Sequence, residues 1–414
     1  MNKQMENKKI LIIGAGIGQI HLVQLAKEMG LYVIVVSPKG YPAIEYADEL
    51  FECDIYDYDR IAEFGKIRQV DAVTSDQNDL MVPAVAYVAE KLGLPGLTYE
   101  QALSYCDKNR FRSVCRAVGV SVPDSVSVED SSLDNALSAS LPWIVKPADS
   151  QSSMGISKVE HIEDYPKAIE YALSKSKRRK AIVEQFFTGD EYVCEGFVYN
   201  GKYYNIFLGD RRYFKGTLIP SQTLFPSMLD DATKEEIIDC ERKIAARIRP
   251  SFGIVHSEYL INHDTHEYII VESAIRGGGV YISSHLIPLA TGLDVNKLLL
   301  QCAFDEKVDV ESFFKEKENK AAAYVCFTLP EGVVEGVRGL DEVAKLPGVS
   351  YCDIRDMQVG QHTFKMVAKG QRKGPILISG ENRAELELVI KRIQQTLTVK
   401  VKTDEGNLLR EIWD

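Results

Sequence analysis

The sequence predicts an α/β fold that opens with a parallel, doubly wound sheet and continues into α+β regions built on antiparallel strands. Residues 10–36 read as a strand, a helix and a strand, the start of such a sheet. Residues 254–271 carry two β-branched apolar runs joined by a polar turn, which is typical of a β-hairpin. From residue 321 onward short strands alternate with one helix, and this pattern predicts a C-terminal α+β cap.

Length and composition are those of an ordinary globular protein with material for about two to four domains, because the chain has 414 residues. Lys and Arg number 49 against 60 Asp and Glu, a net charge of −11, so nothing favours a nucleic acid as partner. No apolar run is long enough to cross a membrane. The eight cysteines show no CxxC pair and no zinc-like spacing, which favours reduced thiols and a cytoplasmic location.

The glycine-rich turn at residues 14–18 follows the first strand and invites comparison with a dinucleotide site. The dinucleotide fingerprint requires glycine at its sixth position, where this chain has Gln19. The second strand ends at Ser37-Pro38, without an acidic residue to hold a ribose. An NAD-linked oxidoreductase is therefore the least favoured alternative. A later strand at residues 72–75 precedes Asp76-Gln77-Asn78-Asp79 and a helix, and the first domain is expected to end between residues 95 and 105.

A polar loop between two short strands is the first candidate for phosphate binding. The strand at residues 141–146 ends at Lys146, and the small, hydroxyl-rich residues 150–155 precede a strand at 156–159. Such a loop can fold over phosphates and offer backbone N–H donors, and a lysine supplies a point charge. The alternative is a plain hairpin loop with a lysine that reaches to solvent.

A strand at residues 181–183 runs into Glu184-Gln185-Phe186-Phe187, where a strand edge could present free backbone groups to an adenine. Strands at 192–199 and 203–208 follow, joined by an Asn-Gly turn. Residues 209–216, which include Arg211 and Arg212, read as a basic surface loop, with contact to an anionic substrate as the alternative.

The hairpin at residues 254–271 carries the second group of candidate residues. Antiparallel pairing should bring Glu258 close to Glu272, and two close carboxylates repel unless a proton or a cation lies between them. Oxygen ligands of this kind suit Mg²⁺. Arg276 follows and is apt for a phosphoryl oxygen. The alternatives are two solvated glutamates, or a zinc site at His263 and His266, which lacks an HExxH motif or a cysteine partner.

Taken together, the order and spacing of these motifs resemble the ATP-grasp superfamily, in the carboxylate–amine ligase branch that is similar to L-amino-acid ligases, biotin carboxylase and purine-pathway ligases. The resemblance covers nearly the whole chain. It implies an N-terminal Rossmann-like (pre-ATP-grasp) domain at residues 1–104, an ATP-grasp nucleotide-binding and catalytic region at 105–307, and a C-terminal α+β cap domain at 308–414.

The resemblance also implies a role for each motif. Arg276 and Lys146 are the implied catalytic residues, and Glu258 and Glu272 the implied metal ligands. The implied ATP-binding positions are Lys108, Lys146, Ser152, Ser153, Gly155, Glu184, Gln185, Phe187 and Glu191, of which the last matches a ribose-binding acid. The substrate pocket is expected to draw on residues 76–79, 211–212 and 277–284.

One position departs from the family pattern. The family usually has Glu-x-Asn at the second metal strand, where this chain has Glu272-Ser273-Ala274. Ala274 cannot ligate a metal, and Ser273 should point to the opposite face of the strand. The number of bound metal ions, one or two, therefore stays open.

The function implied by the resemblance is that of an ATP-dependent ligase. It would convert a small-molecule carboxylate into an acyl phosphate, join it to an amine as an amide or peptide, and release ADP and phosphate. ATP and Mg²⁺, with Mn²⁺ as an alternative metal, are the implied cofactors, and a homodimer is common among similar enzymes. The alternatives are a non-catalytic ATP-binding protein and a biotin-type carboxylase, although the chain has no Met-Lys-Met biotinylation segment.

Overall fold

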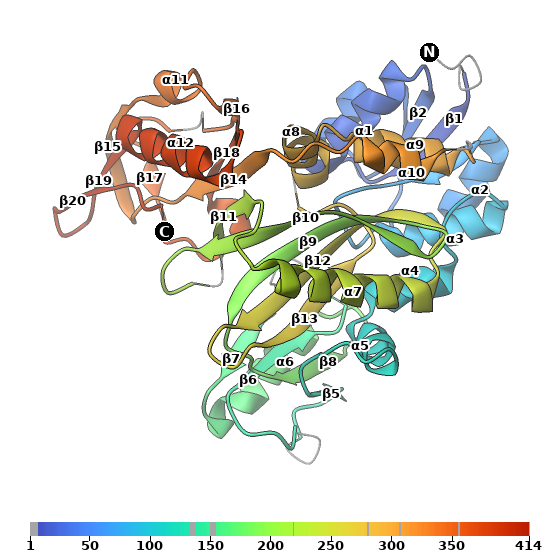
Figure 1. The fold of residues 1–414 in the computed structure, drawn as a ribbon, viewed down its shortest axis with the longest axis horizontal. Helices are drawn as coiled ribbons and strands as arrows, with labels where there is room; N and C mark the ends of the chain where they lie inside the picture. The colour runs from blue at the N-terminus through green and yellow to red at the C-terminus, as the bar shows by residue number, and fades with distance from the viewer. Residues whose placement is uncertain are drawn as a thin grey trace.

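The fold is described from a computed structural model of the chain. It describes residues 7–132, 137–149, 155–217, 219–279, 281–305, 308–354 and 357–413. The strands of these described residues form four sheets. Figure 1 shows the N-terminal part (blue) and the C-terminal part (orange to red) on opposite sides of a central sheet, with a smaller lobe (cyan to green) below it. No helix among these residues has the length and apolar character that a membrane span requires.

The N-terminal sheet is parallel, as predicted, with strand order β3-β2-β1-β4. Its strands are β1 (Lys9–Ile13), β2 (Tyr32–Val36), β3 (Glu49–Phe51) and β4 (Ala72–Thr74), and its helices are α1 (Ile17–Glu28), η1 (Pro42–Tyr46), α2 (Tyr58–Arg68) and α3 (Val82–Leu92). Successive residues of β1 from Ile10 to Ile13 are fully buried. Burial of consecutive residues means that both faces of this sheet are covered, as expected for a parallel α/β layer.

The smaller lobe is an antiparallel sheet with strand order β5-β8-β6-β7. Its elements are β5 (Ser125–Val128), β6 (Trp143–Pro147), β7 (Ser157–Val159), η3 (Ile162–Asp164), α6 (Tyr165–Lys175) and β8 (Ala181–Gln185). The helices α4 (Tyr99–Cys106) and α5 (Lys108–Ala117) link it to the N-terminal domain. The side chain of Asp107 caps α5 by accepting from the N–H groups of Asn109 and Arg110.

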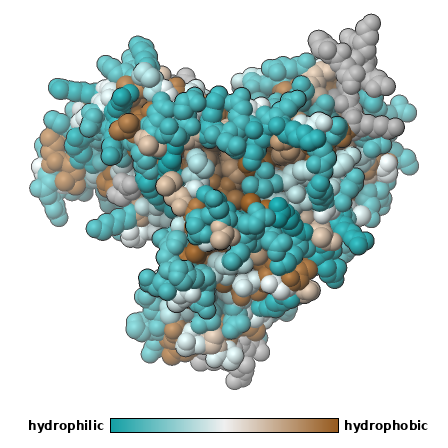
Figure 2. Space-filling model, viewed as in Figure 1, coloured by the Kyte–Doolittle hydropathy of each residue, from teal (hydrophilic) through white to brown (hydrophobic). Residues whose placement is uncertain are grey.

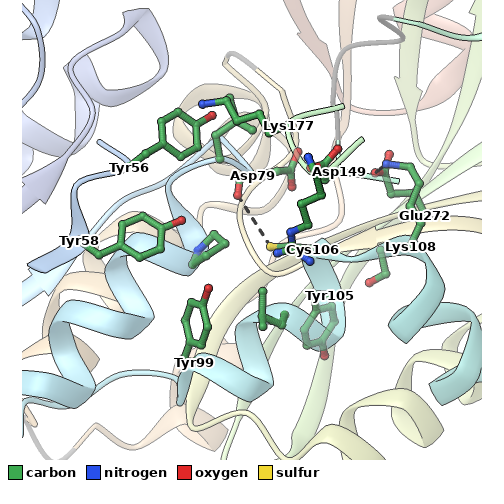
Figure 3. A pocket seen from close by; sticks show the side chains of 15 residues that line it. Tyr56, Tyr58, Asp79, Tyr99, Tyr105, Cys106, Lys108, Asp149, Lys177 and Glu272 are labelled. Carbon is green, nitrogen blue, oxygen red and sulfur yellow. Dashed lines mark hydrogen bonds and ion pairs between the residues drawn. The ribbon is translucent and has the colours of Figure 1, made fainter. Parts of the chain in front are cut away.

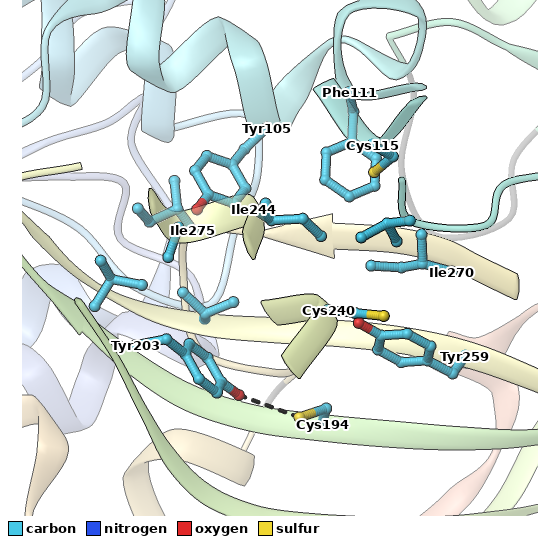
Figure 4. Packing of buried hydrophobic residues seen from close by; sticks show 14 of the residues in the cluster. Tyr105, Phe111, Cys115, Cys194, Tyr203, Cys240, Ile244, Tyr259, Ile270 and Ile275 are labelled. Atoms are coloured by element: carbon cyan, nitrogen blue, oxygen red, sulfur yellow. Dashed lines mark hydrogen bonds between the residues drawn. The ribbon is translucent and has the colours of Figure 1, made fainter. Parts of the chain in front are cut away.

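The large antiparallel sheet has the strand order β13-β12-β9-β10-β11-β14-β18-β16. Its strands are β9 (Asp190–Tyr199), β10 (Lys202–Tyr213), β11 (Pro220–Phe225), β12 (Phe252–Asn262), β13 (Glu267–Ala274), β14 (Ala321–Phe327), β16 (Val349–Cys352) and β18 (Lys373–Gly380). The helix α7 (Asp231–Ile248) packs on β9 and β10 through the apolar cluster in Figure 4. The predicted hairpin is confirmed as β12 and β13.

One expectation about this sheet is wrong. Residues 209–216 were expected to form a surface loop, but β10 continues through Tyr213 and pairs with β11. The charged run Asp210-Arg211-Arg212 made this strand look like a surface loop. In the structure each of these charges is paired with an opposite charge from another element, Asp210 with an arginine and the two arginines with glutamates, which the local sequence does not show. Arg211 is consequently almost buried, with 7% of its side chain exposed.

The C-terminal part shares the large sheet and adds a sheet of its own. β14 pairs with β11 and with β18, so the large sheet continues from the middle of the chain into the C-terminal part. The further sheet has the order β17-β15-β19-β20, with β15 (Gly332–Arg338), β17 (His362–Thr363), β19 (Thr398–Lys402) and β20 (Leu408–Arg410). Figure 2 shows hydrophobic residues at its outer end, where Leu408 and Leu409 are exposed.

The remaining helices connect these sheets. They are η4 (Ile282–Leu286), α8 (Ile287–Thr291), α9 (Val295–Ala303), α10 (Val310–Lys315), α11 (Leu340–Val343), η5 (Lys369–Gln371) and α12 (Arg383–Thr396). α9 packs on both the N-terminal domain and β12. The buried side chain of Leu300 belongs to the core of the N-terminal sheet, and that of Leu298 to a core beneath β12. One helix therefore joins two cores and fixes the N-terminal domain against the large sheet.

Candidate active site

The carboxylates of Glu258 and Glu272 lie directly opposite each other on β12 and β13. Residues in this relation place their Cβ atoms about 4.5–5.5 Å apart on the same face of the sheet. The Nζ atom of Lys108, from the first turn of α5, lies 3.5 Å from Oε1 of Glu272. The predicted proximity of the two glutamates is confirmed. Lys108, which is distant from both in the sequence, is in contact with Glu272.

Arg211 of β10 connects Glu258 to Glu191 of β9. One guanidinium nitrogen, Nη1, lies 2.5 Å from Oε1 of each carboxylate, and the Tyr213 hydroxyl donates to Glu191. Burial raises the pKa of Glu191. Burial also acts to raise the pKa of Glu258, but Arg211 and His256 outweigh it and hold the pKa of that carboxyl well below its usual range. The Glu258 carboxyl group is therefore ionised in the folded protein.

A buried histidine lies behind Glu258 on the same strand. The Nδ1 atom of His256 is 2.5 Å from Oε1 of Glu195, and its Nε2 atom is 3.5 Å from Oε1 of Glu258. Burial lowers the pKa of His256, but the Glu195 carboxylate outweighs this and raises it to about 9. A protonated imidazole thus adds positive charge beside the glutamates. The sequence reasoning missed His256 and Glu195. The alternation of His256 with Glu258 on one strand was the only local signal, because Glu195 lies on β9.

Lys146 and Arg112 share one buried carboxylate, that of Glu184. Oε2 of Glu184 is 2.6 Å from Nζ of Lys146, and Oε1 accepts from Nε of Arg112 at 2.8 Å. Burial alone would raise the pKa of Glu184, but the two cations lower it to about 2. Burial also lowers the pKa of Lys146, against the opposing influence of Glu184. The predicted phosphate lysine is thus held in place by a glutamate that was predicted to contact ATP itself.

The backbone around residue 185 differs from the expectation of a free strand edge. β8 lies inside its sheet and pairs with β5 on one side and β6 on the other. The N–H of Gln185 donates to the carbonyl of Asp124, and the N–H of Phe186 donates to that of Pro142. The run Ala181–Gln185 is apolar enough for an interior strand, and this is the feature that the edge interpretation overlooked.

Arg276 lies just beyond β13 and forms an ion pair with the loop that follows β4. Its Nε and Nη2 atoms lie 2.9 and 2.8 Å from the two oxygens of Asp79. In the same loop the buried carboxylate of Asp76 accepts from the N–H of Gly277, the hydroxyl of Ser283 and the amide of Asn296. These contacts bring together residues 76–79 and 277–284, two of the three segments from which the substrate pocket is expected. The N-terminal domain thereby positions the arginine.

Part of the predicted phosphate loop lies outside the described residues, including Ser152 and Ser153. Gly155 at its end has a φ of +79°, and a Cβ atom there would lie 2.7 Å from Cγ of Pro147. Only glycine combines this backbone conformation with so close an approach to β6. The loop therefore ends against the strand that carries Lys146.

The donor set of the hairpin fits Mg²⁺ better than zinc. Within the residues that the structure describes, no cluster of three or more His, Cys, Asp or Glu side chains could hold a metal by itself. Two facing carboxylates suffice for Mg²⁺, which completes its shell with water and substrate phosphates. His263 is instead engaged with Tyr192, 2.9 Å from its hydroxyl.

Comparison with known proteins agrees with this geometry. Residues 139–284 match the family profile of the ATP-grasp domain, and residues 325–402 match L-amino acid ligase C-terminal domain 2. The alanine–anticapsin ligase of Bacillus subtilis is 23% identical over 394 residues, which cover 83% of this chain and 80% of the relative.

Solved structures share the fold over nearly the whole chain. An L-amino acid ligase from Bacillus licheniformis superimposes with a TM-score of 0.80 at 21% identity and covers 95% of this chain and 98% of its own. A phosphoribosylglycinamide synthetase from Anaerococcus prevotii gives a TM-score of 0.75 at 22% identity, with 96% and 100% covered.

The fold and the matched domain make the chain a member of the ATP-grasp superfamily. Its ligase-type C-terminal domain places it in the carboxylate–amine ligase branch. The chain is thus an ADP-forming, ATP-using ligase that makes C–N bonds.

Proposed function

We propose that this ligase joins an amino acid, activated at its carboxylate, to a second amine through an acyl phosphate. The observation that carries the proposal is the facing pair Glu258 and Glu272, with Lys108 beside it. Two facing carboxylates can hold Mg²⁺, and the bound ion together with Lys108 would neutralise phosphate charge at the point where a phosphoryl group is transferred. The relatives that are named L-amino acid ligase and alanine–anticapsin ligase support amino acids as the substrate class.

The roles of the ATP-binding residues are part of this proposal. Lys108 and Lys146 would contact phosphate oxygens, with Ser152, Ser153 and Gly155 closing over them. Glu184 would act indirectly, because its carboxylate holds Lys146. Since the N–H of Gln185 is already used, an adenine contact would come from its carbonyl oxygen or from Phe187. Glu191 would reach the ribose from its position beside Arg211.

Glu258 and Glu272 would hold Mg²⁺, or Mn²⁺ in its place, which supplies positive charge to the phosphates when it is bound. Arg211 and Lys108 now supply positive charge to the same carboxylates. These two side chains therefore offset the repulsion between the two close carboxylates in the protein alone.

The reaction balances in two steps. A carboxylate oxygen of the first substrate attacks the γ-phosphorus of ATP, and the bond to ADP breaks. The amine nitrogen of the second substrate then attacks the acyl carbon, loses its proton, and phosphate leaves. Arg276 would neutralise the oxygens of the acyl phosphate, held at the correct angle by Asp79. Exclusion of water during the interval prevents hydrolysis of the intermediate.

The setting of the reaction also belongs to the proposal. We place the enzyme in the cytoplasm as a homodimer, without nucleic-acid or membrane partners. The support is the acidic composition, with a net charge of −11, and the scattered cysteines.

A hydroxamate trap tests the proposed function. Protein, Mg-ATP and hydroxylamine are incubated with a panel of amino acids, and hydroxamate and ADP are measured. Hydroxamate with matching ADP would be formed by the native protein and be at least about 100-fold lower in Glu272→Gln. Glu267→Gln, an exposed position on the same strand, is the matched control. ADP release at full rate by Glu272→Gln would overturn the metal-ligand assignment.

A further inference from the structure

A cavity of about 310 Å³ lies between the N-terminal domain and the first turn of α5. Its wall on the N-terminal domain is apolar and aromatic, formed by Tyr56, Tyr58, Leu80, Pro83, Tyr99 and Leu103. Figure 3 shows Tyr58 and Tyr99 on one side and Asp79, Lys108 and Glu272 on the other. The cavity therefore has an aromatic end and a charged end.

The tyrosine rings of the aromatic end pack against one another in the protein alone. The rings of Tyr58 and Tyr99 lie 6.3 Å apart at 70°, and Tyr87 packs behind both, at 5.6 and 5.8 Å. The hydroxyl of Tyr87 is anchored by Asp59 at 2.7 Å. Burial raises the pKa of Tyr58 to about 12, so its ring stays neutral. A preformed aromatic wall binds a flat apolar group with little loss of side-chain entropy.

The charged end touches the residues to which we assign the chemistry. Asp79 grips Arg276, and Lys108 lies 3.5 Å from Glu272. Asp149 accepts from the N–H of Arg178 through Oδ2, while its buried Oδ1 has no hydrogen-bond partner among the described residues. Three acids and three basic side chains line the cavity, namely Asp79, Asp149 and Glu272 with Lys108, Lys177 and Arg178. Such a surface matches a molecule with one ammonium and one carboxylate better than a polyanion.

We propose that this cavity selects an amino acid with an aromatic side chain as a substrate. The ring lies against Tyr58 and Tyr99, and the ammonium and carboxylate groups face Asp79, Lys108 and Glu272. The volume is at the lower end of small-molecule sites, enough for one ring with its backbone atoms. The inference rests on the proposed function, because it names the class of one substrate of that same site.

Calorimetric titration of the whole protein tests the cavity without turnover. L-phenylalanine is expected to bind at least about tenfold more tightly than L-alanine. Tyr99→Ala should weaken L-phenylalanine about tenfold and leave L-alanine unchanged. Tyr171→Ala, a partly exposed tyrosine of α6 outside the cavity, is the control and should change neither value. Equal affinities for the two amino acids, or unchanged phenylalanine binding in Tyr99→Ala, would overturn the proposal.

A filling substitution covers the case in which removal of a tyrosine unfolds the protein. Leu80→Trp reduces the space at the aromatic end, so L-phenylalanine should bind at least about tenfold more weakly while L-alanine still binds. Unchanged phenylalanine binding in this variant would again contradict the assignment.

The hydroxamate trap separates this inference from the proposed function. Hydroxamate from small amino acids, with no advantage of L-phenylalanine in binding, would leave the ligase standing and remove the aromatic site. Tight binding of L-phenylalanine without hydroxamate from any carboxylate would support the aromatic site and contradict the proposed acyl-phosphate reaction.

Discussion

Asp79 and Arg276 form a two-point ion pair that joins the N-terminal domain to the segment just after the β12–β13 hairpin. Both oxygens of the carboxylate are used, at 2.9 and 2.8 Å, and the two side chains are 20% and 12% exposed. A guanidinium bound at two points has a fixed plane. The orientation of Arg276, the arginine proposed to be catalytic, is thus set by a residue 197 positions away in the chain.

Asp79→Asn should lower both the turnover and the stability of the protein. Asparagine keeps the shape but loses the charge and one acceptor, so Arg276 can leave its plane. We expect kcat for ADP release to fall about 10- to 100-fold and the free energy of unfolding to fall by about 1.5–3 kcal/mol. Steady-state kinetics and urea unfolding measure the two quantities. Glu52→Gln, an exposed acid of the same domain, is the control; a normal kcat in Asp79→Asn would refute the positioning role.

Arg112 joins the two halves of the proposed nucleotide site. Its side chain is 1% exposed, donates to Glu184, and also donates through Nη2 to the carbonyl of Val271 at 2.6 Å. Val271 directly precedes Glu272. The buried guanidinium of Arg112 therefore fixes both Glu184, which pairs with Lys146, and the strand that carries Glu272, the proposed metal ligand.

Arg112→Met should be among the most damaging substitutions in this region. It leaves Glu184 buried with one cation in place of two, and we expect a loss of about 3–5 kcal/mol in the free energy of unfolding. Arg112→Lys should recover part of the stability but not the affinity for ADP, because lysine cannot reach both partners. Urea unfolding and ADP titration check this. Arg110→Met, an exposed arginine of the same helix, should change neither.

The two carboxylates of the hairpin could be predicted from the sequence because both strands and their turn are local. Alternation and the polar turn fix the pairing to within a residue or two, and the structure has Glu258 opposite Glu272. Arg211 could not be predicted in the same way. It is buried because Glu191 and Glu258 come to it from other strands, and these two partners lie 20 positions before it and 47 positions after it in the chain.

The contacts of the N-terminal domain show the same limit. The sequence placed Asp76 and Asp79 near the site as a group, but gave no reason for their different tasks. Asp76 accepts hydrogen bonds from Gly277 and Ser283 and so fixes their loop, whereas Asp79 forms an ion pair with Arg276. Which carboxylate meets which partner depends on how α9 fixes the domain against the large sheet, and this is a packing result without a local pattern.

Gly278 should be intolerant of any side chain. A Cβ atom at this position would lie 2.6 Å from Oε1 of Glu195 and 2.9 Å from Nδ1 of His256. Gly278→Ala must therefore displace the buried pair behind Glu258, and we expect about 1–3 kcal/mol less stability together with slower ADP release. At the next residue, Gly279, a Cβ atom would meet nothing within 4 Å. Gly279→Ala is thus the control, and equal effects of the two substitutions would contradict the steric argument.

Glu241 should make the stability of the protein depend on pH. It lies in α7 beneath the large sheet, and the Tyr259 hydroxyl is 2.5 Å from its Oε1 atom. Burial raises the pKa of Glu241 from 4.5 to about 7. Between these two pH values the folded protein holds a proton that the unfolded chain has released. The free energy of unfolding therefore falls as the pH rises from about 4.5 to 7, by about 3 kcal/mol from this group.

Glu241→Gln removes this proton and keeps the size of the side chain. The variant should lose the contribution of Glu241 to the pH dependence, so that its stability relative to the native protein rises by about 3 kcal/mol between pH 5 and pH 8. Urea unfolding at intervals across this range measures the difference, and it cancels the titration of His256 and other groups that both proteins share. Glu235→Gln, exposed on the same helix, should give a difference that does not change with pH. A difference for Glu241→Gln that is equally flat would show that Glu241 is ionised in the folded protein, with the Tyr259 hydroxyl as its donor.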